Sequence, residues 1–302
     1  MVGAGNVGQS AALFIAEKEL GDVVLVDIVP DMPRGKALDI LEGAPVGHFD
    51  ADVRGESDMG AVSGADIVII TAGSARKPGM TRDDLLEVNV KVVKSIAENI
   101  KKHAPESFVV VVTNPLDVMA WVTKEVTGFD RRRVVGMAGV LDGSRFSAFI
   151  AEELGVSVKD VSAMVMGGHG DSMVPIVSCA SVSGIPITEL LPKQKIEKLI
   201  ERTRFAGGEI VKLLGTGSAY VSPAASAVMM AEAYLKDQRR IVAASAYLEG
   251  KYGISGIYLG VPVKLSGAGV ERIIEIKLTD GEREMLNASA DAVREEIKKV
   301  KL

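Results

Sequence analysis

The sequence contains very little cysteine and histidine. Among its 302 residues there is one cysteine, Cys179, and there are three histidines. A single cysteine can neither close a disulfide within the chain nor supply a CxxC site, which is typical of a reducing compartment. One cysteine and widely scattered histidines also lack the ligand spacing of a zinc site. We therefore expect neither a disulfide framework nor a bound metal.

Long apolar runs and basic runs are absent as well. No segment approaches the roughly 18 consecutive apolar residues of a membrane-spanning helix, and we expect no signal peptide at the start. The formal net charge is −5 and the sequence pI is about 5.4, so no part of the chain is expected to attract a phosphate backbone. These features predict a soluble, cytoplasmic protein that binds neither membranes nor nucleic acid.

The first half of the chain has a regular pattern. Hydrophobic residues make up 47% of the sequence, enough for lobes of about 150 residues with their own cores. Near-continuous apolar runs, typical of strands buried on both faces, alternate with segments of helical spacing. The runs are residues 23–27, 66–72, 107–113 and 134–138, and the helical segments are about 7–20, 33–44, 81–103 and 116–128. The alternation predicts an α/β fold with a Rossmann-type, doubly wound parallel sheet.

The second half has a mixed pattern. Its expected elements are a helix at about 142–155, a strand at 161–167, long helices within about 193–236, strands at 257–265 and 272–278, and a charged helix at about 280–300. Because strands and helices do not alternate regularly here, we predict a mixed α+β domain. The predicted division gives a first domain over residues 1–139 and a second, catalytic domain over residues 140–302.

A glycine motif lies at the start of the chain, with Gly3, Gly5 and Gly8 in the GxGxxG spacing. Such glycines allow a tight turn and a close approach of the backbone to a pyrophosphate, which the amides of the following helix bind. Asp27 ends the next strand about 20 residues further on, where a carboxylate binds the adenosine ribose and repels a 2′-phosphate. The pattern favours NAD over NADP. Only two residues precede Gly3, so either the chain as given begins late or its central strand is short.

His169 lies between glycines in the segment GGHGDSMVP. The glycines bring backbone close and leave space beside the imidazole ring, which suits a ligand pocket, although a turn residue would show the same pattern. His48 lies in a polar loop and His103 near the end of a basic helix. We interpret these two as solvated or capping residues, which leaves His169 as the candidate for chemistry.

Three arginines lie near the predicted nucleotide cleft. Arg76 and Arg82 follow the strand at 66–72, in the loop position where such sheets bind ligands, and Arg145 lies near the start of the second domain. Guanidinium groups there could hold anionic substrate groups through bidentate hydrogen bonds. The alternative is that these arginines only face solvent.

Six segments occur in order across nearly the whole chain: GAGNVG, ITAGSARKPGMTRDDLL, TNPLD, GMAGVLDGSRF, GGHGDSMVP and GVPVKLSGAGVE. Together they resemble the lactate/malate dehydrogenase family, above all its lactate-dehydrogenase-like malate dehydrogenases. The resemblance implies reversible hydride transfer between (S)-malate and NAD, giving oxaloacetate and NADH, as in the tricarboxylic acid cycle. It also implies self-association, with a homotetramer favoured over a homodimer.

The resemblance assigns a role to each matching residue. His169 matches the proton donor and acceptor, and Asp142 the carboxylate that pairs with it and should raise its pKa. Arg145 matches the residue that binds the carboxylate common to these substrates, and Arg82 the catalytic loop residue that polarises the ketone oxygen. Asn114 matches a residue that binds the substrate oxygen near the nicotinamide. The cofactor contacts implied are Gly3, Gly5, Asn6, Val7, Gly8, Asp27, Asn89, Val112 and Asn114.

Arg76 matches the position that distinguishes substrates in this family. An arginine there partners a second carboxylate, whereas lactate dehydrogenases carry an uncharged residue, usually glutamine. The resemblance therefore implies a small dicarboxylate as substrate, malate or oxaloacetate. The alternatives are a lactate or other 2-hydroxy acid dehydrogenase, an NAD-dependent glycosidase, which requires a metal site, and a non-catalytic NAD-binding module.

Overall fold

The computed structural model of the chain describes residues 1–74 and 81–302. Helices and strands alternate through its first half, as the apolar runs predict. The elements are α1 (Asn6–Glu17), β1 (Val23–Val26), α2 (Met32–Gly47), β2 (Val53–Glu56), the 3-10 turn η1 (Met59–Val62), β3 (Ile67–Ile70), α3 (Arg82–His103), β4 (Phe108–Val111), α4 (Leu116–Thr127) and β5 (Val134–Gly136). Each predicted strand is present and ends before its apolar run does, while β2 is a strand that no apolar run predicted.

The second half holds shorter strands among its helices. Its elements are α5 (Gly139–Leu154), η2 (Val158–Asp160), β6 (Val161–Ser162), β7 (Val165–Met166), β8 (Val174–Pro175), η3 (Val177–Cys179), β9 (Ser181–Val182), β10 (Ile185–Pro186), α6 (Ile187–Leu190), α7 (Lys193–Leu214), α8 (Val221–Leu235), β11 (Arg240–Glu249), η4 (Lys251–Gly253), β12 (Ser255–Ser266), β13 (Gly269–Ile273) and α9 (Asp280–Lys298). The predicted mixed α+β character is confirmed.

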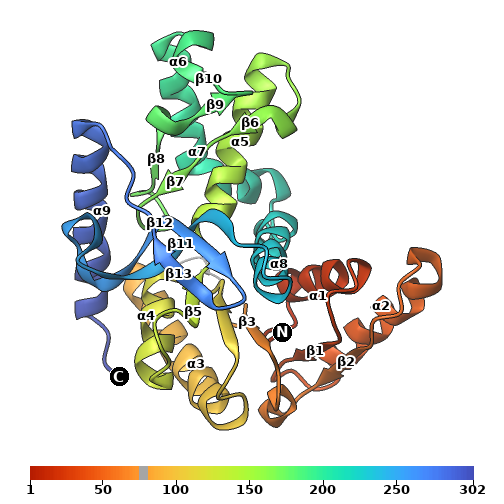
Figure 1. The fold of residues 1–302 in the computed structure, drawn as a ribbon. Helices are drawn as coiled ribbons and strands as arrows, with labels where there is room; N and C mark the ends of the chain where they lie inside the picture. The colour runs from red at the N-terminus through yellow and green to blue at the C-terminus, as the bar shows by residue number, and fades with distance from the viewer. Residues whose placement is uncertain (75–80) are drawn as a thin grey trace.

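A single sheet runs through both halves of the chain (Figure 1). Its six strands lie in the order β13-β12-β11-β5-β4-β3, with β3, β4 and β5 parallel and β11, β12 and β13 antiparallel. Beside β3, the parallel pair β1–β2 continues the arrangement, and Val2 links the two sets of strands through parallel bridges to Val26 and Ile70. The Rossmann-type sheet is therefore extended by a large antiparallel part from the end of the chain.

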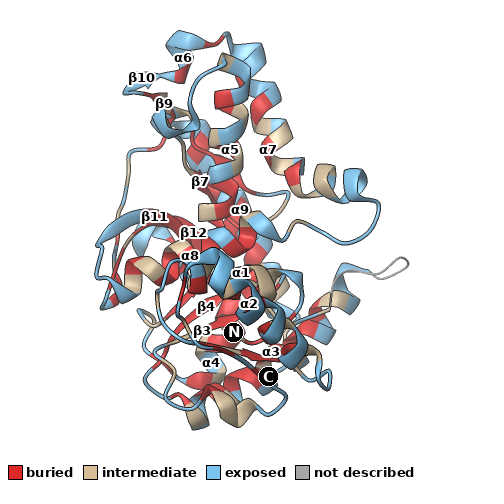
Figure 2. Cartoon of the chain, turned by 90° about the vertical axis from the view of Figure 1, so that its right-hand side faces the viewer, coloured by how far each residue is buried: buried red, intermediate tan, exposed pale blue. Residues whose placement is uncertain are grey.

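Helices cover both faces of the parallel strands, so β4 is buried completely. Phe108 and Val110 belong to an apolar cluster with residues of α8, whereas Val109 and Val111 belong to a second cluster with residues of α3 and α4. The ring of Phe108 stacks on Tyr234 of α8, with ring centroids 4.4 Å apart. Figure 2 shows the buried residues gathered along the sheet and on the helix faces that pack on it. This is the doubly wound arrangement that the uninterrupted apolar runs predicted.

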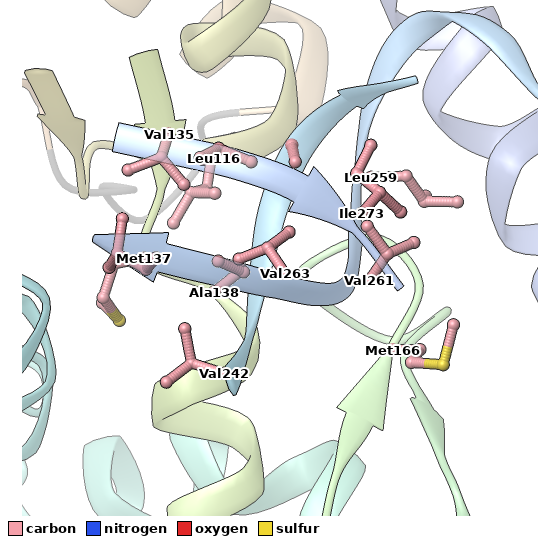
Figure 3. Packing of buried hydrophobic residues seen from close by; sticks show 14 of the residues in the cluster. Leu116, Val135, Met137, Ala138, Met166, Val242, Leu259, Val261, Val263 and Ile273 are labelled. Carbon is pink, nitrogen blue, oxygen red and sulfur yellow. The ribbon is translucent and has the colours of Figure 1, made fainter. Parts of the chain in front are cut away.

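The parallel and antiparallel parts meet at β5 and β11. Val135 of β5 and Val263 of β12 share one apolar cluster with Leu116 at the start of α4 (Figure 3). Gly136 pairs with Ser245 across the joint, and a Cβ on Gly136 would collide with the side chains of Leu116 and Ser245. A glycine is therefore needed here, and the joint places Ser245 next to the beginning of α4.

The expected strand at 272–278 is wrong in its second part, because β13 ends at Ile273. Tyr252 of η4 occupies the backbone groups that a neighbouring strand would use. Its hydroxyl donates to the carbonyl oxygen of Ile274 at 2.8 Å and accepts from the N–H of Ile276 at 3.1 Å. The Tyr252 hydroxyl thus satisfies backbone groups of Ile274 and Ile276, and the strand pairing of β13 ends before them.

Two other expected elements are divided. The strand at 161–167 is β6, which pairs with β9, followed by β7, which pairs with β8. The helical pattern at 193–236 is α7 and α8, separated by the glycine-containing segment GTGSAY at 215–220. The long strand β11 was not predicted at all, and the sheet depends on it.

Within residues 1–74 and 81–302, none of the helices combines the length and the apolar character that a membrane span requires. In the same residues, no group of three or more histidine, cysteine, aspartate or glutamate side chains is arranged to hold a metal ion.

Candidate active site

The glycine turn lies between the ends of β1 and β3 and is supported on both sides. The N–H of Gly3 donates to the carbonyl oxygen of Val26 at 2.7 Å, and the carbonyl of Val2 accepts from the N–H groups of Thr71 and Ala72 at 2.8 and 2.9 Å. Although only two residues precede the turn, its backbone is fixed by both neighbouring strands.

The shape of the turn fits a pyrophosphate. A Cβ on Gly3 would collide with the backbone of Ala72, and a Cβ on Gly8 with the carbonyl oxygen of Gly3. Around Gly5, by contrast, no described atom lies within 4 Å of where a Cβ would be. Among the described residues no side chain caps α1, which begins after Gly5. The backbone N–H groups of its first turn, which begins with Asn6 and Val7, are therefore available to an anion.

Asp27 lies directly after β1 and is fixed beside this turn. Its Oδ2 accepts from the N–H of Ala4 at 2.7 Å and its Oδ1 from the N–H of Val29 at 3.1 Å. Each carboxylate oxygen has further lone pairs. The arrangement suits the two hydroxyls of an adenosine ribose.

Gly5→Ala is expected to weaken NADH binding about tenfold or more, which is about 1.4 kcal/mol, while the melting temperature changes little. The backbone of Gly5 has φ −65° and ψ −171°, a conformation that alanine adopts freely, and the added methyl group would occupy the open space above α1. Titration calorimetry with NADH measures the effect. Gly43→Ala in α2, where a Cβ also meets no described atom within 4 Å, is the matched control. Equal NADH affinity in the two variants would contradict this cofactor site.

The predicted contacts Asn89, Val112 and Asn114 come together at the ends of β3 and β4. The buried Asn89 accepts from the N–H of Ser74 at 2.7 Å and donates to the carbonyl oxygens of Ser74 and Asn114 at 3.2 and 2.7 Å. The N–H of Val112 donates to the carbonyl of Ile70 at 2.9 Å. Asn89 thus holds the backbone of Asn114. Asn114 itself is exposed and lines the same cavity as His169.

His169 and Asp142 form a direct pair, with Nδ1 and Oδ2 2.7 Å apart. Asp142 lies in the first turn of α5, and its Oδ1 accepts from Nη1 of Arg145, one helical turn later, at 3.1 Å. Burial alone would lower the pKa of the His169 imidazole, but the charge and hydrogen bond of Asp142 outweigh it, so the pKa lies above 6.5. Because Nδ1 is engaged, Nε2 is the ring nitrogen left to exchange a proton.

The loop that carries His169 is held by three successive backbone N–H groups, those of residues 167–169. They donate to the carbonyl oxygen of Gly260, the hydroxyl of Ser289 and the carboxylate of Asp117, at 2.9, 2.8 and 2.7 Å. These partners lie on β12, α9 and α4. Three distant elements therefore fix the position of the imidazole.

Arg82 lies at the start of α3 and pairs with Asp171, with Nη2 and Oδ2 2.6 Å apart. Both side chains are exposed. A cavity of about 590 Å³ is lined by Arg82, Asn114 and His169, with Gly208 of α7 on another wall. The sequence-predicted arginine, asparagine and histidine thus share one cavity.

Arg145 lies beside an unusual stretch of α7. Among the described residues its Nε has no hydrogen-bond partner although it is buried, and its Nη2 is 3.8 Å from where a Cβ on Gly207 would be. Adjacent glycines in a helix interior each cost about 1 kcal/mol relative to alanine, so Gly207 and Gly208 call for a reason. They leave space beside the guanidinium and the cavity, which suits a bound carboxylate.

One residue of the predicted site, Arg76, lies outside the described residues, and others were missed. Asp117 and Asp171 were missed although both stand in the quoted motifs, TNPLD and GGHGDSMVP. The signal there is an aspartate a few residues after Asn114 or His169. Ser245 and Ser289 have no such signal, because each reaches the site from a distant element.

Both halves of the chain match known proteins. The family model for the lactate/malate dehydrogenase NAD-binding domain matches residues 1–136, and the model for the α/β C-terminal domain of the same family matches residues 139–302. The chain is 52% identical to malate dehydrogenase 1 of Anaeromyxobacter dehalogenans (strain 2CP-C) over 304 residues, which cover 100% of this chain and 97% of that protein.

Two solved structures from Cryptosporidium parvum are also similar. Its malate dehydrogenase is 43% identical with a TM-score of 0.96, over 98% of this chain and 96% of the other. Its lactate dehydrogenase, complexed with lactic acid and nicotinamide adenine dinucleotide, is 44% identical with a TM-score of 0.95, over 98% of this chain and 95% of the other. The fold is therefore similar to that of enzymes named for two different substrates.

Proposed function

The chain belongs to the lactate/malate dehydrogenase family and is an NAD-dependent oxidoreductase, and we propose that it interconverts (S)-malate and oxaloacetate. The observation that carries the proposal is the pairing of His169 with the buried Asp142, at a cavity that also holds Arg82 and Asn114. The relatives named as malate dehydrogenases, more than half identical over the full chain, support the substrate. The reaction belongs to the tricarboxylic acid cycle.

Each side chain has a distinct task in this proposal. The hydroxyl proton of malate passes to Nε2 of His169, and Asp142 stabilises the imidazolium that forms. Arg145 binds the carboxylate next to the reacting carbon, and Arg82 and Asn114 hold the oxygen on which charge develops. NAD, when bound at the glycine turn, supplies the acceptor for the hydride. Residues 1–139 bind the cofactor and residues 140–302 supply the histidine.

For Arg82 to reach the substrate oxygen, its ion pair with Asp171 has to open. Both partners are exposed, with 72% and 60% of their side-chain areas accessible, and such pairs contribute only about 0–1 kcal/mol. An oxaloacetate dianion in the cavity competes easily with a contact of this strength. The pair therefore holds Arg82 near the site without locking it.

The activity is expected to follow the protonation of His169. Reduction of oxaloacetate takes a proton from the imidazolium, so kcat/KM for oxaloacetate should be highest at low pH and fall as the pH rises through the pKa. Because Asp142 raises that pKa, the midpoint is expected above 6.5. Oxidation of malate needs the neutral ring and should show the opposite limb, rising with pH. Initial rates measured across the pH range in both directions check this, and a midpoint below 6.5 would contradict the role of Asp142.

One assay tests the reaction, the substrate and the cofactor together. Rates of NADH consumption with oxaloacetate and with pyruvate, repeated with NADPH, should be highest for oxaloacetate with NADH. Lactate dehydrogenase is the second candidate, favoured by the similarity to the Cryptosporidium parvum enzyme, and equal or better use of pyruvate would establish it. NADH binding without any turnover would instead indicate a non-catalytic module.

We propose further that the protein acts as a homotetramer in the cytoplasm. Large apolar side chains are exposed on α2, on α7 and on β11, among them Val46, Leu213 and Ile241 with 83%, 79% and 62% of their areas accessible. Where such side chains gather into a contiguous patch, they are typical of surfaces that associate. Sedimentation velocity gives the assembly size, and a monomer at assay concentrations would refute the assembly.

A further inference from the structure

A second carboxylate lies behind the candidate histidine, and no role in the proposed reaction accounts for it. Asp117 is only 4% exposed. Its Oδ2 accepts from the backbone N–H of His169 at 2.7 Å and its Oδ1 from the hydroxyl of Ser245 at 2.6 Å. Each oxygen thus has a short contact with a donor, so the carboxylate is fixed at both ends.

The position of Asp117 joins three parts of the fold. Its residue lies in the first turn of α4, where the helix dipole favours a negative charge. Ser245, which fixes it from the other side, lies on β11 opposite Gly136, at the joint between the parallel and antiparallel strands. A movement of this joint would therefore shift the Asp117 carboxylate and, with it, the His169 backbone.

Charged groups lie near His169 on three of the helices around it and on the cavity side. Asp142 and Arg145 approach from α5, Asp117 from α4, Glu296 from α9, and Arg82 with Asp171 from the cavity side. Burial raises the pKa of Asp117 and, together with the charge of Asp117, that of Glu296. The charge of Asp117 also raises the pKa of His169, since it favours the imidazolium.

We infer that Asp117, held by Ser245, is a positioning residue of the hydride-transfer reaction. It fixes the backbone of His169 and places a second negative charge behind the imidazolium. The inference rests on the proposed function for the role of His169 as proton donor. Asp142 holds the ring through Nδ1, and Asp117 holds the main chain, so the two carboxylates constrain the imidazole independently.

The first test is Asp117→Asn, which keeps the size and an acceptor oxygen but removes the charge. We expect kcat for oxaloacetate reduction to fall about tenfold, equivalent to about 1.4 kcal/mol, with NADH binding unchanged. The falling limb of the pH profile should move to lower pH, because the imidazolium loses a stabilising charge. Ser245→Ala keeps the carboxylate of Asp117 but removes the hydrogen bond to its Oδ1. We therefore expect a smaller loss of kcat, and a falling limb at nearly the same pH as in the unchanged protein.

A matched control is Ser289→Ala, because Ser289 accepts from the neighbouring N–H of Gly168 at 2.8 Å and carries no charge. This variant should lower the melting temperature without moving the pH limb. A merely structural role for Asp117 would give the same result in Asp117→Asn. The pH limb therefore separates a positioning role from simple destabilisation.

Direct titration of the imidazole gives a readout that does not depend on turnover. The chain has only three histidines, so the His169 ring signal in an NMR titration can be assigned as the one missing from His169→Asn. We expect its midpoint to fall in Asp117→Asn and to stay in Ser289→Ala. If Asp117→Asn does not fold, Ser245→Ala decides, and unchanged kcat in that variant overturns the inference.

The outcomes separate this inference from the proposed function. If His169→Asn keeps its activity, the proposed function fails, whatever Asp117 does. If His169→Asn is inactive while Asp117→Asn shows unchanged kcat, pH limb and His169 titration, only the inference about Asp117 is overturned.

Discussion

His169→Asn is expected to lower turnover of oxaloacetate by about 10²–10⁴-fold, the usual contribution of a positioned general acid. The substituted side chain keeps a polar group near Oδ2 of Asp142 and is smaller than imidazole. An amide, however, neither gains nor loses a proton near neutral pH. The variant should therefore bind NADH and oxaloacetate but transfer no proton to the developing alkoxide.

The fold should survive this substitution. The loop is held through the backbone N–H groups of residues 167–169, and asparagine retains all of them. Asp142 also keeps its ion pair with Arg145, at 3.1 Å, so no uncompensated buried charge is left behind. Circular dichroism and thermal melting should be close to those of the unchanged protein.

His48→Asn is the matched control. His48 is exposed and has a left-handed backbone with φ 56° at the end of α2, a conformation that asparagine tolerates well. Its turnover should remain unchanged. Steady-state rates of both variants, together with NADH binding, give the comparison. Near-normal turnover in His169→Asn would refute the proton-transfer role.

Local signals explain why the first half of the fold could be predicted. A strand such as β4, buried on both faces, needs an uninterrupted apolar run, and the run at 107–113 is visible without knowledge of any partner. The GxGxxG spacing likewise lies within a single turn, where Gly8 is needed because a Cβ there would collide with the carbonyl oxygen of Gly3. Elements of this kind are determined largely by nearby sequence.

The second half depends more on contacts between distant residues. The strand expected at 272–278 ends early because Tyr252, about 20 residues before it, takes over its backbone hydrogen bonds. β11 was missed although it is long and largely buried, since Arg240 at its start and the polar Ser245 in its middle interrupt the apolar pattern. Such elements are decided by their partners, and these are not visible from sequence spacing.

The candidate site shows the same division. His169 and Asp142 were predicted as a pair by resemblance, and the structure places them 2.7 Å apart. The support of the same histidine by Asp117 and Ser245 was not predicted. Ser245 is 128 residues from Asp117 in the sequence, and its hydroxyl becomes significant only because β11 joins the sheet at Gly136. Residues that transfer charge or protons can thus be recognised by motif, whereas those that position them emerge from the fold.

We expect the choice between malate and lactate to depend on the charge of Arg76, a residue that lies outside the described part of the chain. Oxaloacetate carries a second carboxylate that pyruvate lacks. A charge-assisted hydrogen bond to that group is worth about 1.5–3 kcal/mol, or roughly 10–150-fold in affinity. With pyruvate, an arginine facing the substrate would remain without an anionic partner, which adds a penalty against the monocarboxylate.

Arg76→Gln is therefore expected to lower kcat/KM for oxaloacetate by well over tenfold, within the range of about 10–150-fold set by one charge-assisted hydrogen bond. The efficiency with pyruvate should rise, because glutamine imposes no unpaired charge. NADH affinity should be unchanged, since the glycine turn and Asp27 are untouched. Arg132→Gln, an exposed arginine paired with Asp130 just before β5, is the control and should leave both efficiencies as they are. Steady-state kinetics with the two keto acids make the comparison, and an unaltered ratio of their efficiencies would show that the substrate is selected elsewhere in the site.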